Sequence, residues 1–293
     1  MARTNSDIIV PGDDRKVERP AAMKQADFVS SFARGLETLK IFSAEQPRHS
    51  IASAATATGM NRAATRRILL TLVELGYAFM EDELFELTPK VLELGHAYLS
   101  SWQVVDLVRP SLKTVVDAVQ ENCSMGVLDG GNVVYIARSE MRRIVQSAII
   151  SVGSRIPTNV ASMGRAILSQ RTEAFVSDYL IRYPLQRFTD QTVMSRRKFI
   201  EMLAVTRKQG WCLVEGEFEV GLMSLAVPVL DLKGDAVAAI NVGAPTSRAT
   251  RDDMIERFLP PLLAASKTIS RSLNLSDRHP ADIILSMNGQ SEN

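Results

Sequence analysis

Cysteine and histidine are scarce in this chain of 293 residues, and their scarcity excludes several kinds of site. The two cysteines, Cys123 and Cys212, are far apart in the sequence and form no CxxC pair. This usage is typical of a reducing compartment, and it argues against a disulfide framework and against a cysteine-based zinc site. We therefore expect a cytoplasmic protein that holds no metal and needs no cofactor.

The motifs of the common enzyme classes are missing as well. The chain has three histidines, and none of them lies in residues 104–275. A Ser–His or Cys–His nucleophile pair is therefore not expected in that region. No GxSxG, GxGxxG, HExxH or Walker sequence occurs. The acidic residues within 215–219 could offer a carboxylate pair, but alternation along a strand edge explains their spacing more simply. We expect that the protein is not an enzyme.

Neither a strong net charge nor a long apolar run is present. The formal net charge is +1, so no global field indicates nucleic acid or a membrane surface. No apolar run approaches a membrane span, and residues 1–23 lack the apolar core of a signal peptide. Hydrophobic residues make up 46% of the chain, enough for two domains that each bury a core. Residues 1–26 and 276–293 lack periodic apolar residues, and we expect flexible tails there.

Residues 50–76 carry the pattern of two helices joined by a tight turn. Ser50 and Asn61 can cap the two helices, and Gly59 supplies the left-handed turn between them. The second helix is expected to turn four residues inward: Ala64, Ile68, Leu72 and Leu75. Its first turns are expected to expose side chains that suit base edges and phosphates: Asn61, Arg62, Ala63, Thr65, Arg66 and Arg67. The pattern predicts a DNA-binding helix-turn-helix; the alternative is a helical hairpin whose polar face is only solvated.

The residues on either side of this pair complete a small domain. Two short apolar runs around Glu81-Asp82-Glu83 predict a hairpin that serves as a wing. An upstream helix is expected to cover the core of the hairpin with one apolar stripe: Phe32, Leu36, Leu39 and Phe42. Residues 27–88 hold six Lys/Arg and eight Asp/Glu, a net charge of −2. Because affinity for DNA depends on neutralising phosphates, binding must rely on the arginines at 62, 66 and 67. The acidic wing is expected to contribute little or to point its acids away from the duplex.

A helix is predicted to follow the wing, because Pro89 suits a helix start and apolar residues recur at helical spacing. These residues are Val91, Leu94, Tyr98 and Trp102. The stripe could pack on its own domain or on the same helix of a second subunit. Palindromic operators require two-fold symmetric proteins, and this favours a dimerisation helix in 89–103.

The rest of the chain predicts an α+β domain, because strands and helices are mixed without strict βαβ alternation. Strands are expected at 124–128, 133–137, 144–151, 211–215, 224–230 and 236–243. Helices are expected at 104–121, 162–170, 173–183, 195–210 and 251–273, the last with a kink at Pro260-Pro261.

Several sequence blocks in this order resemble the IclR-type transcriptional regulators, most closely the PcaR/PcaU/PobR group that controls the β-ketoadipate pathway. The resemblance runs from about residue 28 to residue 272 and is carried by SFARGLETLKIFSAE, ATRRILLTLVELGYAF, LTPKVLELGHAYLSS, VGSRIPTNVASMGRAIL, QGWCLVEGEFEVGLMSLAVPV and AAINVGAP. It implies a winged helix-turn-helix in 27–88, a linker helix in 89–103, and a GAF-like effector-binding domain in 104–275 with a central antiparallel sheet.

The resemblance also implies an effector pocket beside the helix that follows the IP segment. Matched motif by motif, its residues are Val145, Ala148, Ile156, Ser162, Met163, Glu215 (or Glu217), Ser224, Asn241 and Gly243. The local chemistry suits a small organic anion, because a helix N-terminus favours a carboxylate and the two serines and Asn241 add donors. Some family members carry a cysteine where Ser224 stands here. The alternative is that Ser224 and Asn241 only satisfy backbone groups in a buried sheet.

The expected function is that of a ligand-responsive transcriptional regulator of aromatic-acid catabolism genes. Its expected partners are double-stranded operator DNA, a small aromatic or dicarboxylic acid and a second copy of the chain, as a homodimer or a dimer of dimers. RNA polymerase is a further candidate partner, and no membrane is expected. The narrower group implies an activator; the alternative is a repressor of the same family that responds to an unrelated small organic acid.

Overall fold

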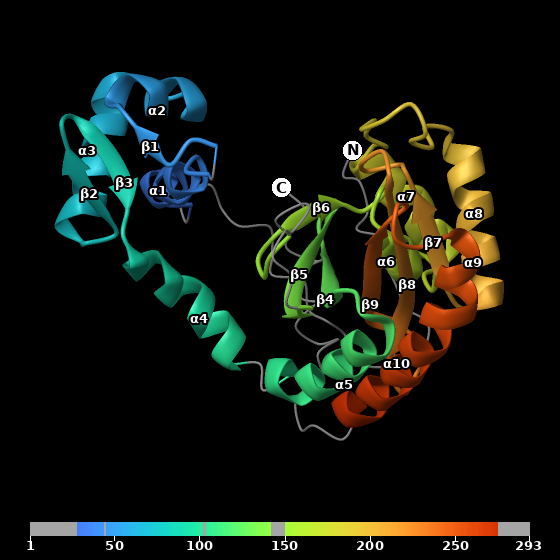
Figure 1. The fold of residues 1–293 in the computed structure, drawn as a ribbon. Coiled ribbons are helices and arrows are strands. Elements are labelled where there is room, and N and C mark those ends of the chain that lie inside the picture. Colours follow the sequence, from blue (N-terminus) through green and yellow to red (C-terminus); the bar gives the residue numbers. More distant parts are fainter. Residues whose placement is uncertain (1–27, 44, 102–103, 142–149, 275–293) are drawn as a thin grey trace. The chain divides into compact units, whose positions relative to one another are not determined.

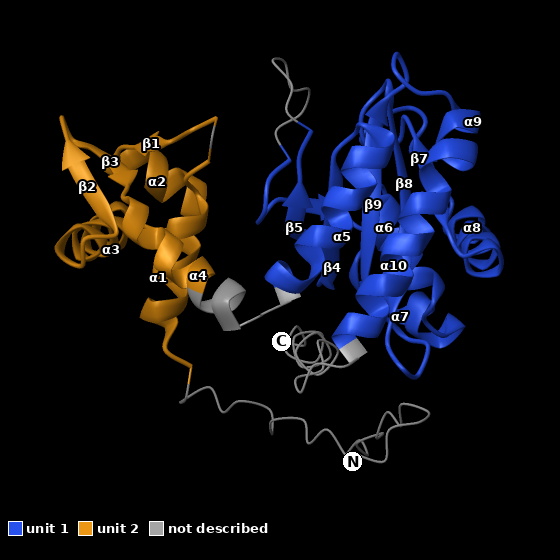
Figure 2. Cartoon of the chain, turned by 60° about the horizontal axis from the view of Figure 1, so that its bottom comes forward, with its two compact units in different colours: residues 1–12, 103–293 blue, residues 13–102 orange. Residues whose placement is uncertain are grey.

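The computed structural model describes residues 28–43, 45–101, 104–141 and 150–274. The chain divides into two compact units, one within residues 13–102 and the other within residues 103–293 (Figure 2). Each unit has its own sheet and its own helices. No helix of the described ranges is long and apolar enough to cross a membrane.

The N-terminal unit is a winged helix-turn-helix (Figure 1). Its three-stranded antiparallel sheet has the order β1-β3-β2. Ala54, Leu69 and Phe85 form the centre of its core, with Ile41 and Phe42 packed against them. The elements are α1 (Ser30–Lys40), β1 (Arg48–His49), α2 (Ile51–Thr58), α3 (Arg62–Glu74), β2 (Ala78–Glu81) and β3 (Leu84–Leu87).

The predicted caps and turn of the helix pair are confirmed. The Ser50 side chain accepts a hydrogen bond from the Ser53 N–H, and the Asn61 side chain accepts one from the Ala64 N–H. Gly59 ends α2 in the left-handed region with φ of 67°. These contacts satisfy backbone donors that the first turn of a helix leaves unpaired, so short local signals were enough to place both helices.

The predicted inner face of α3 is partly confirmed, because Ala64 and Leu72 are buried as expected, but Ile68 is only partly buried and Leu75 is exposed. Thr65 and Leu69 are fully buried, whereas Leu75 is 53% exposed. The buried residues one turn apart, from Thr65 through Leu69 to Leu72, define the inner face, and Leu75 lies beyond the end of the helix. The Thr65 hydroxyl donates to the Asn61 carbonyl, so Thr65 does not present its side chain to solvent.

The predicted stripe of the first helix is also partly wrong. Phe32 and Leu36 are exposed, at 67% and 42%, and do not cover the core of the hairpin. Thr38 is the buried residue of α1, and Ile41 and Phe42 after its end reach the core. The exposed face also includes Phe28 and Val29.

A short 3-10 turn (η2, Pro89–Val91) and α4 (Leu92–Ser101) follow the wing. Pro89 takes the first position of this turn, as the sequence predicted, and Thr88 caps the turn through its side chain. Of the two aromatic residues proposed for dimerisation, Trp102 lies outside the described residues, as does the side chain of Tyr98. Dimerisation through this helix therefore stays a prediction.

The C-terminal unit is an α+β domain around a six-stranded antiparallel sheet of order β6-β5-β4-β9-β8-β7. Helices α6, α7 and α8 share a core with one face of this sheet. Helices α5 and α10 pack together against the other face. The strands are β4 (Cys123–Asp129), β5 (Asn132–Ser139), β6 (Arg155–Pro157), β7 (Cys212–Glu215), β8 (Leu222–Leu230) and β9 (Ala236–Pro245); the helices are α5 (Val104–Val119), α6 (Ser162–Ser169), α7 (Glu173–Arg182), α8 (Arg196–Gln209) and α10 (Leu259–Asn274).

Most of the strand expected at 144–151 lies outside the described residues, and the three-residue strand β6 was not predicted. The helix expected at 251–273 is present as one uninterrupted helical run made of α9 (Arg251–Asp253), a π-helical stretch η3 (Met254–Phe258) and α10. Pro260 and Pro261 have no N–H to bond the preceding turn, and this favours a changed hydrogen-bond pattern just before them.

The turn at the tip of the wing stores backbone strain. Asp82 and Glu83 join β2 to β3 with φ of 49° and 63°, although both carry side chains. A two-residue hairpin turn of this kind favours Asn-Gly. We expect Asp82→Asn with Glu83→Gly to raise the free energy of opening of this hairpin by about 1 kcal/mol, measured by hydrogen exchange of β2 and β3 amides.

Gly59→Ala is the matched control for this pair of changes. Its φ is 67° and no atom lies within 4 Å of an added Cβ, so the change tests backbone strain alone. It should destabilise the unit by a similar amount. Equal protection of the hairpin amides before and after the two turn substitutions would contradict the assignment of strain to this turn.

Candidate functional site

The exposed end of α3 carries a cluster of arginines. Arg62, Arg66 and Arg67 are exposed, as are Asn61 and Ala63. Among the residues that the structure describes, none of the three guanidiniums takes part in an ion pair. The helix therefore offers cationic and short side chains at one end, which is what contacts with phosphates and base edges require.

The wing has a different charge pattern. Arg48 on β1 donates from Nε to Glu86 at 2.7 Å and from one terminal nitrogen to Glu81 at 3.2 Å. The hydrogen bond with Glu86 raises the pKa of Arg48. Asp82 and Glu83 remain at the tip, where no cation is paired with them in the described part of the chain. The wing thus presents acids at its tip, and its arginine is already engaged.

The C-terminal unit contains a polar pocket beside the N-terminus of α6. Its walls come from β4, β5, β8, β9, the start of α6 and the loops next to them. The volume is about 90 Å³. The lining residues are Glu121, Asn122, Ser124, Tyr135, Arg138, Ile150, Ile156, Val160, Ala161, Ser162, Phe218, Leu222, Ser224, Asn241, Gly243, Pro245 and Arg248.

A chain of neutral hydrogen-bonding groups crosses the base of this pocket. The hydroxyl oxygens of Ser162 and Ser224 are 2.7 Å apart, and the Asn241 amide nitrogen donates to the Ser224 oxygen at 2.8 Å. The Tyr135 side chain lines the same pocket. Burial raises the pKa of Tyr135 to about 12, so its phenol stays protonated at neutral pH. The base of the pocket therefore offers donors without a formal charge.

Two arginines also line the pocket, each paired with a carboxylate. Arg138 is only 12% exposed at its side chain; it donates to Glu140 at 2.9 Å and to the Ser124 hydroxyl at 3.0 Å. Arg248 forms a two-pronged contact with Glu121 at 2.9 and 3.1 Å. Each guanidinium is thus held in place by a carboxylate and has further N–H groups to offer a bound anion.

The sequence did not identify Tyr135 and Arg138 as site residues, because a β-bulge changes the alternation of β5. Positions three apart in a regular strand point to opposite faces. The β4–β5 register shifts between Met125 and Gly126, so that Gly126 pairs with Tyr135 and Ser124 pairs with Arg138. The bulge therefore brings both side chains to the pocket. Arg248 follows β9 in a loop, where no periodic pattern could place it.

The structure brings together five of the predicted effector residues and separates two others. Those that line the pocket are Ile156, Ser162, Ser224, Asn241 and Gly243. Met163 does not line it; one residue further along α6, its side chain turns into the core and approaches Gly126. Glu215 does not line it either, because it ends the edge strand β7 with an exposed side chain 3.8 Å from Arg251.

The remaining predicted residues lie outside the pocket or outside the residues that the structure describes. Glu217, the alternative acid, is buried in an ion pair with Arg165 and is not available to a ligand. Val145 and Ala148 lie outside the described residues. No cluster of three metal-ligating side chains occurs among the residues that could be searched.

Comparison with known proteins identifies both units. Residues 31–78 match the model of the IclR helix-turn-helix domain, and residues 96–271 match that of the bacterial transcriptional regulator IclR C-terminal domain. The chain is 40% identical over 263 residues to the Pca regulon regulatory protein of Pseudomonas putida, covering 88% of this chain and 90% of that protein.

Solved structures agree with this match. A protein of known crystal structure from Rhodococcus sp. RHA1 is 36% identical, with a TM-score of 0.74 over 84% of this chain and 98% of that one. A double mutant of the PobR inducer-binding domain from Acinetobacter, solved with 3-hydroxybenzoic acid, is 28% identical, with a TM-score of 0.54 over 57% of this chain and 97% of that one. The chain belongs to the IclR family of bacterial transcriptional regulators, within the group that includes the Pca and PobR regulators.

Proposed function

We propose that this regulator activates genes of aromatic-acid catabolism when a small aromatic or dicarboxylic acid occupies the pocket beside α6. The observation that carries the proposal is the pocket itself, where neutral donors and two arginines converge on the start of a buried helix. The same chain carries a helix-turn-helix, so one molecule can both bind the acid and read DNA.

In the DNA-binding unit, Arg62 and Arg66 are proposed to reach base edges or phosphates, with Asn61, Ala63 and Arg67 beside them. Their exposure and the absence of a competing acid on α3 near them support this assignment. Thr65 is left out because its hydroxyl is buried and bonded to the Asn61 carbonyl. The acidic tip of the wing is proposed to lie away from the phosphates, because like charges repel.

In the C-terminal unit, the ligand carboxylate is proposed to lie against the start of α6. The first N–H groups of a helix have no partner within it and favour an anion. Ser162, Ser224 and Arg138 would add donors, while Ile156 and Phe218 would flank an apolar or aromatic body. A volume of about 90 Å³ is compatible with a ligand that has a single ring. The PobR domain that binds 3-hydroxybenzoic acid supports this ligand class.

Signalling is proposed to require a homodimer, alone or as a dimer of dimers. The helix within 89–103 is proposed as the contact between subunits, and the exposed apolar side chains of Val29, Phe32 and Leu36 offer further surface to a partner. A two-fold dimer also matches the symmetry of a palindromic operator. A ligand that prefers one of two dimer conformations would shift the spacing of the recognition helices and with it contacts to RNA polymerase.

A repressor that responds to an unrelated small organic acid is the second candidate. The same pocket and the same helix pair would serve it, since a repressor needs only that ligand binding lowers operator affinity. Reporter expression in cells with and without this protein separates the two: loss of an activator abolishes expression, whereas loss of a repressor allows expression without ligand.

Alanine substitution of Arg66 tests the DNA interface. If Arg66 reads a guanine, Arg66→Ala should cost about 1–3 kcal/mol of operator affinity and relax base preference at one position. Arg109→Ala, an equivalent change of an exposed arginine on α5, is the control and should leave affinity unchanged. Equal weakening on all sequences would assign Arg66 to phosphate positioning; no weakening at all would remove it from the interface.

Thermal unfolding of the full chain tests the pocket. The panel is protocatechuate, 4-hydroxybenzoate, β-ketoadipate, cis,cis-muconate and benzoate. A ligand at about 100 times its Kd should stabilise the chain by ~2.7 kcal/mol and raise the unfolding midpoint by several degrees. Arg138→Met should reduce the shift, because it removes a guanidinium from the pocket, whereas Arg197→Met on the surface of α8 should not. No shift with any of the five acids would reject the ligand class.

A further inference from the structure

A buried ion pair lies directly behind the pocket. Arg165 on α6 is 0% exposed, and its two terminal nitrogens donate to the two carboxylate oxygens of Glu217 at 2.8 and 2.6 Å. Its Nε donates to the Asn159 carbonyl at 2.9 Å, and its guanidinium lies 5.2 Å from the centre of the Phe199 ring. The Val193 N–H also donates to Glu217, at 2.9 Å. Both charges are therefore fully bonded in the interior.

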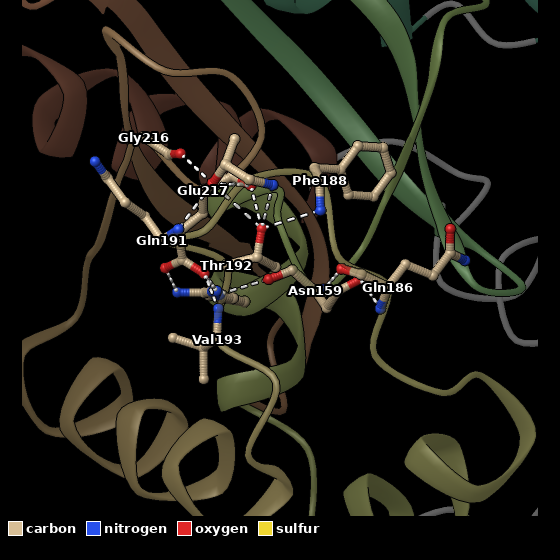
Figure 3. A network of polar contacts seen from close by, with 10 residues as sticks. Asn159, Gln186, Phe188, Gln191, Thr192, Val193, Gly216 and Glu217 are labelled. Atoms are coloured by element: carbon tan, nitrogen blue, oxygen red, sulfur yellow. Dashed lines mark hydrogen bonds and ion pairs between the residues drawn. The ribbon is translucent and has the colours of Figure 1, made fainter.

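The carboxylate side of this pair belongs to the loop between β7 and β8, which side chains from residues 188–193 also contact. Glu217 lies between β7 and β8, outside the strand pairing of the sheet. The hydroxyls of Thr189 and Thr192 donate to the carbonyls of Gly216 and Glu217, at 2.7 Å in each case (Figure 3). A Cβ at Gly216 would collide with the Gln191 side chain. The loop is thus held by side chains that reach it from residues 188–193.

The residue after Glu217 forms part of the pocket wall. Phe218 lines the pocket, and its ring centre is 5.4 Å from that of Phe188. Arg165 lies one helical turn after Ser162, which also lines the pocket, at the start of α6. Neither Arg165 nor Glu217 lines the pocket itself. The pair therefore joins the helix that begins at the pocket to the loop that carries its aromatic wall.

We propose that Arg165 and Glu217 are positioning residues for the ligand pocket. Their two parallel hydrogen bonds fix the distance between the start of α6 and Phe218, and with it the width of the site and the access of solvent to Ser162. Because a guanidinium–carboxylate fork has one preferred geometry, it determines this distance more narrowly than an apolar contact would. The inference deepens the proposed function, since the width of the pocket would decide which acids enter.

The test measures how often the pocket opens, and it uses no ligand. Ser162→Cys introduces a thiol at a position that is 2% exposed, at a helix start that favours the thiolate. The native Cys123 and Cys212 are buried, and burial raises the pKa of both thiols, so they react slowly. The rate of reaction with a disulfide reagent under native conditions then reports exposure of the pocket base in the full chain.

The decisive variant is Arg165→Met with Glu217→Gln in this reporter background. It leaves no unpaired charge, keeps the side-chain volumes similar, and retains an acceptor for the Val193 N–H. We expect the introduced thiol to react roughly tenfold faster or more. Opening of the pocket then no longer requires breaking the two hydrogen bonds between Arg165 and Glu217, so the free energy of local opening is lower. An unchanged rate in a folded variant would overturn the proposal.

Three further variants separate positioning from simple loss of stability. Arg197→Met with Glu201→Gln removes an exposed ion pair of α8 and should leave the rate unchanged. Leu262→Ala destabilises the core on the other face of the sheet. When the two variants have the same unfolding midpoint, it should raise the rate of the thiol reaction less than the double variant does. Arg165→Lys keeps the charge but loses the fork, and it should give an intermediate rate. If the double variant does not fold, the lysine variant decides: a rate equal to that of the reporter alone overturns the proposal.

The outcome is independent of the ligand class. A faster thiol reaction together with no thermal shift for any acid would retain the role of the ion pair and reject the proposed ligands. A thermal shift with one of the acids together with an unchanged thiol rate would retain the proposed ligand class and reject the role of the ion pair.

Discussion

The burial of α6 is the constraint on which the C-terminal unit depends. All eight residues of this helix are buried, so every polar group on it must be bonded within the protein. A Cβ at Gly164 would lie 2.6 Å from the Thr158 carbonyl oxygen, which leaves room for glycine alone. Because the helix is buried on all sides, side chains from different faces of its first turn enter different surroundings. Ser162 reaches the pocket, Met163 the core and Arg165 the buried ion pair.

The parts of the fold that the sequence predicted are those governed by local contacts. Ser50, Gly59 and Asn61 cap or turn the helix pair through groups within four residues, so their roles could be read from residue type and spacing. The neutral base of the pocket was predicted only through the family resemblance, because its residues lie on separate elements.

The parts that the sequence missed depend on contacts between distant residues. Tyr135 and Arg138 share a face only because a bulge in β4–β5 pairing breaks the alternation. Glu215 and Glu217 are two residues apart on an acidic stretch, yet one is exposed near Arg251 and the other lies against a buried arginine fifty-two residues earlier. No local pattern distinguishes these two acids, because the difference is made by α6 and the loop at 188–193.

The carboxylates at the tip of the wing have a consequence for how this regulator searches a genome. If the three exposed arginines of α3 make the phosphate contacts, as proposed, each DNA-binding unit neutralises few phosphates, and the logarithm of its DNA affinity should fall with the logarithm of salt concentration at a slope of only about −3. Non-specific DNA would then hold the protein weakly and briefly. Fewer copies would be sequestered on unrelated sequence, and a small cellular pool could keep its operators occupied.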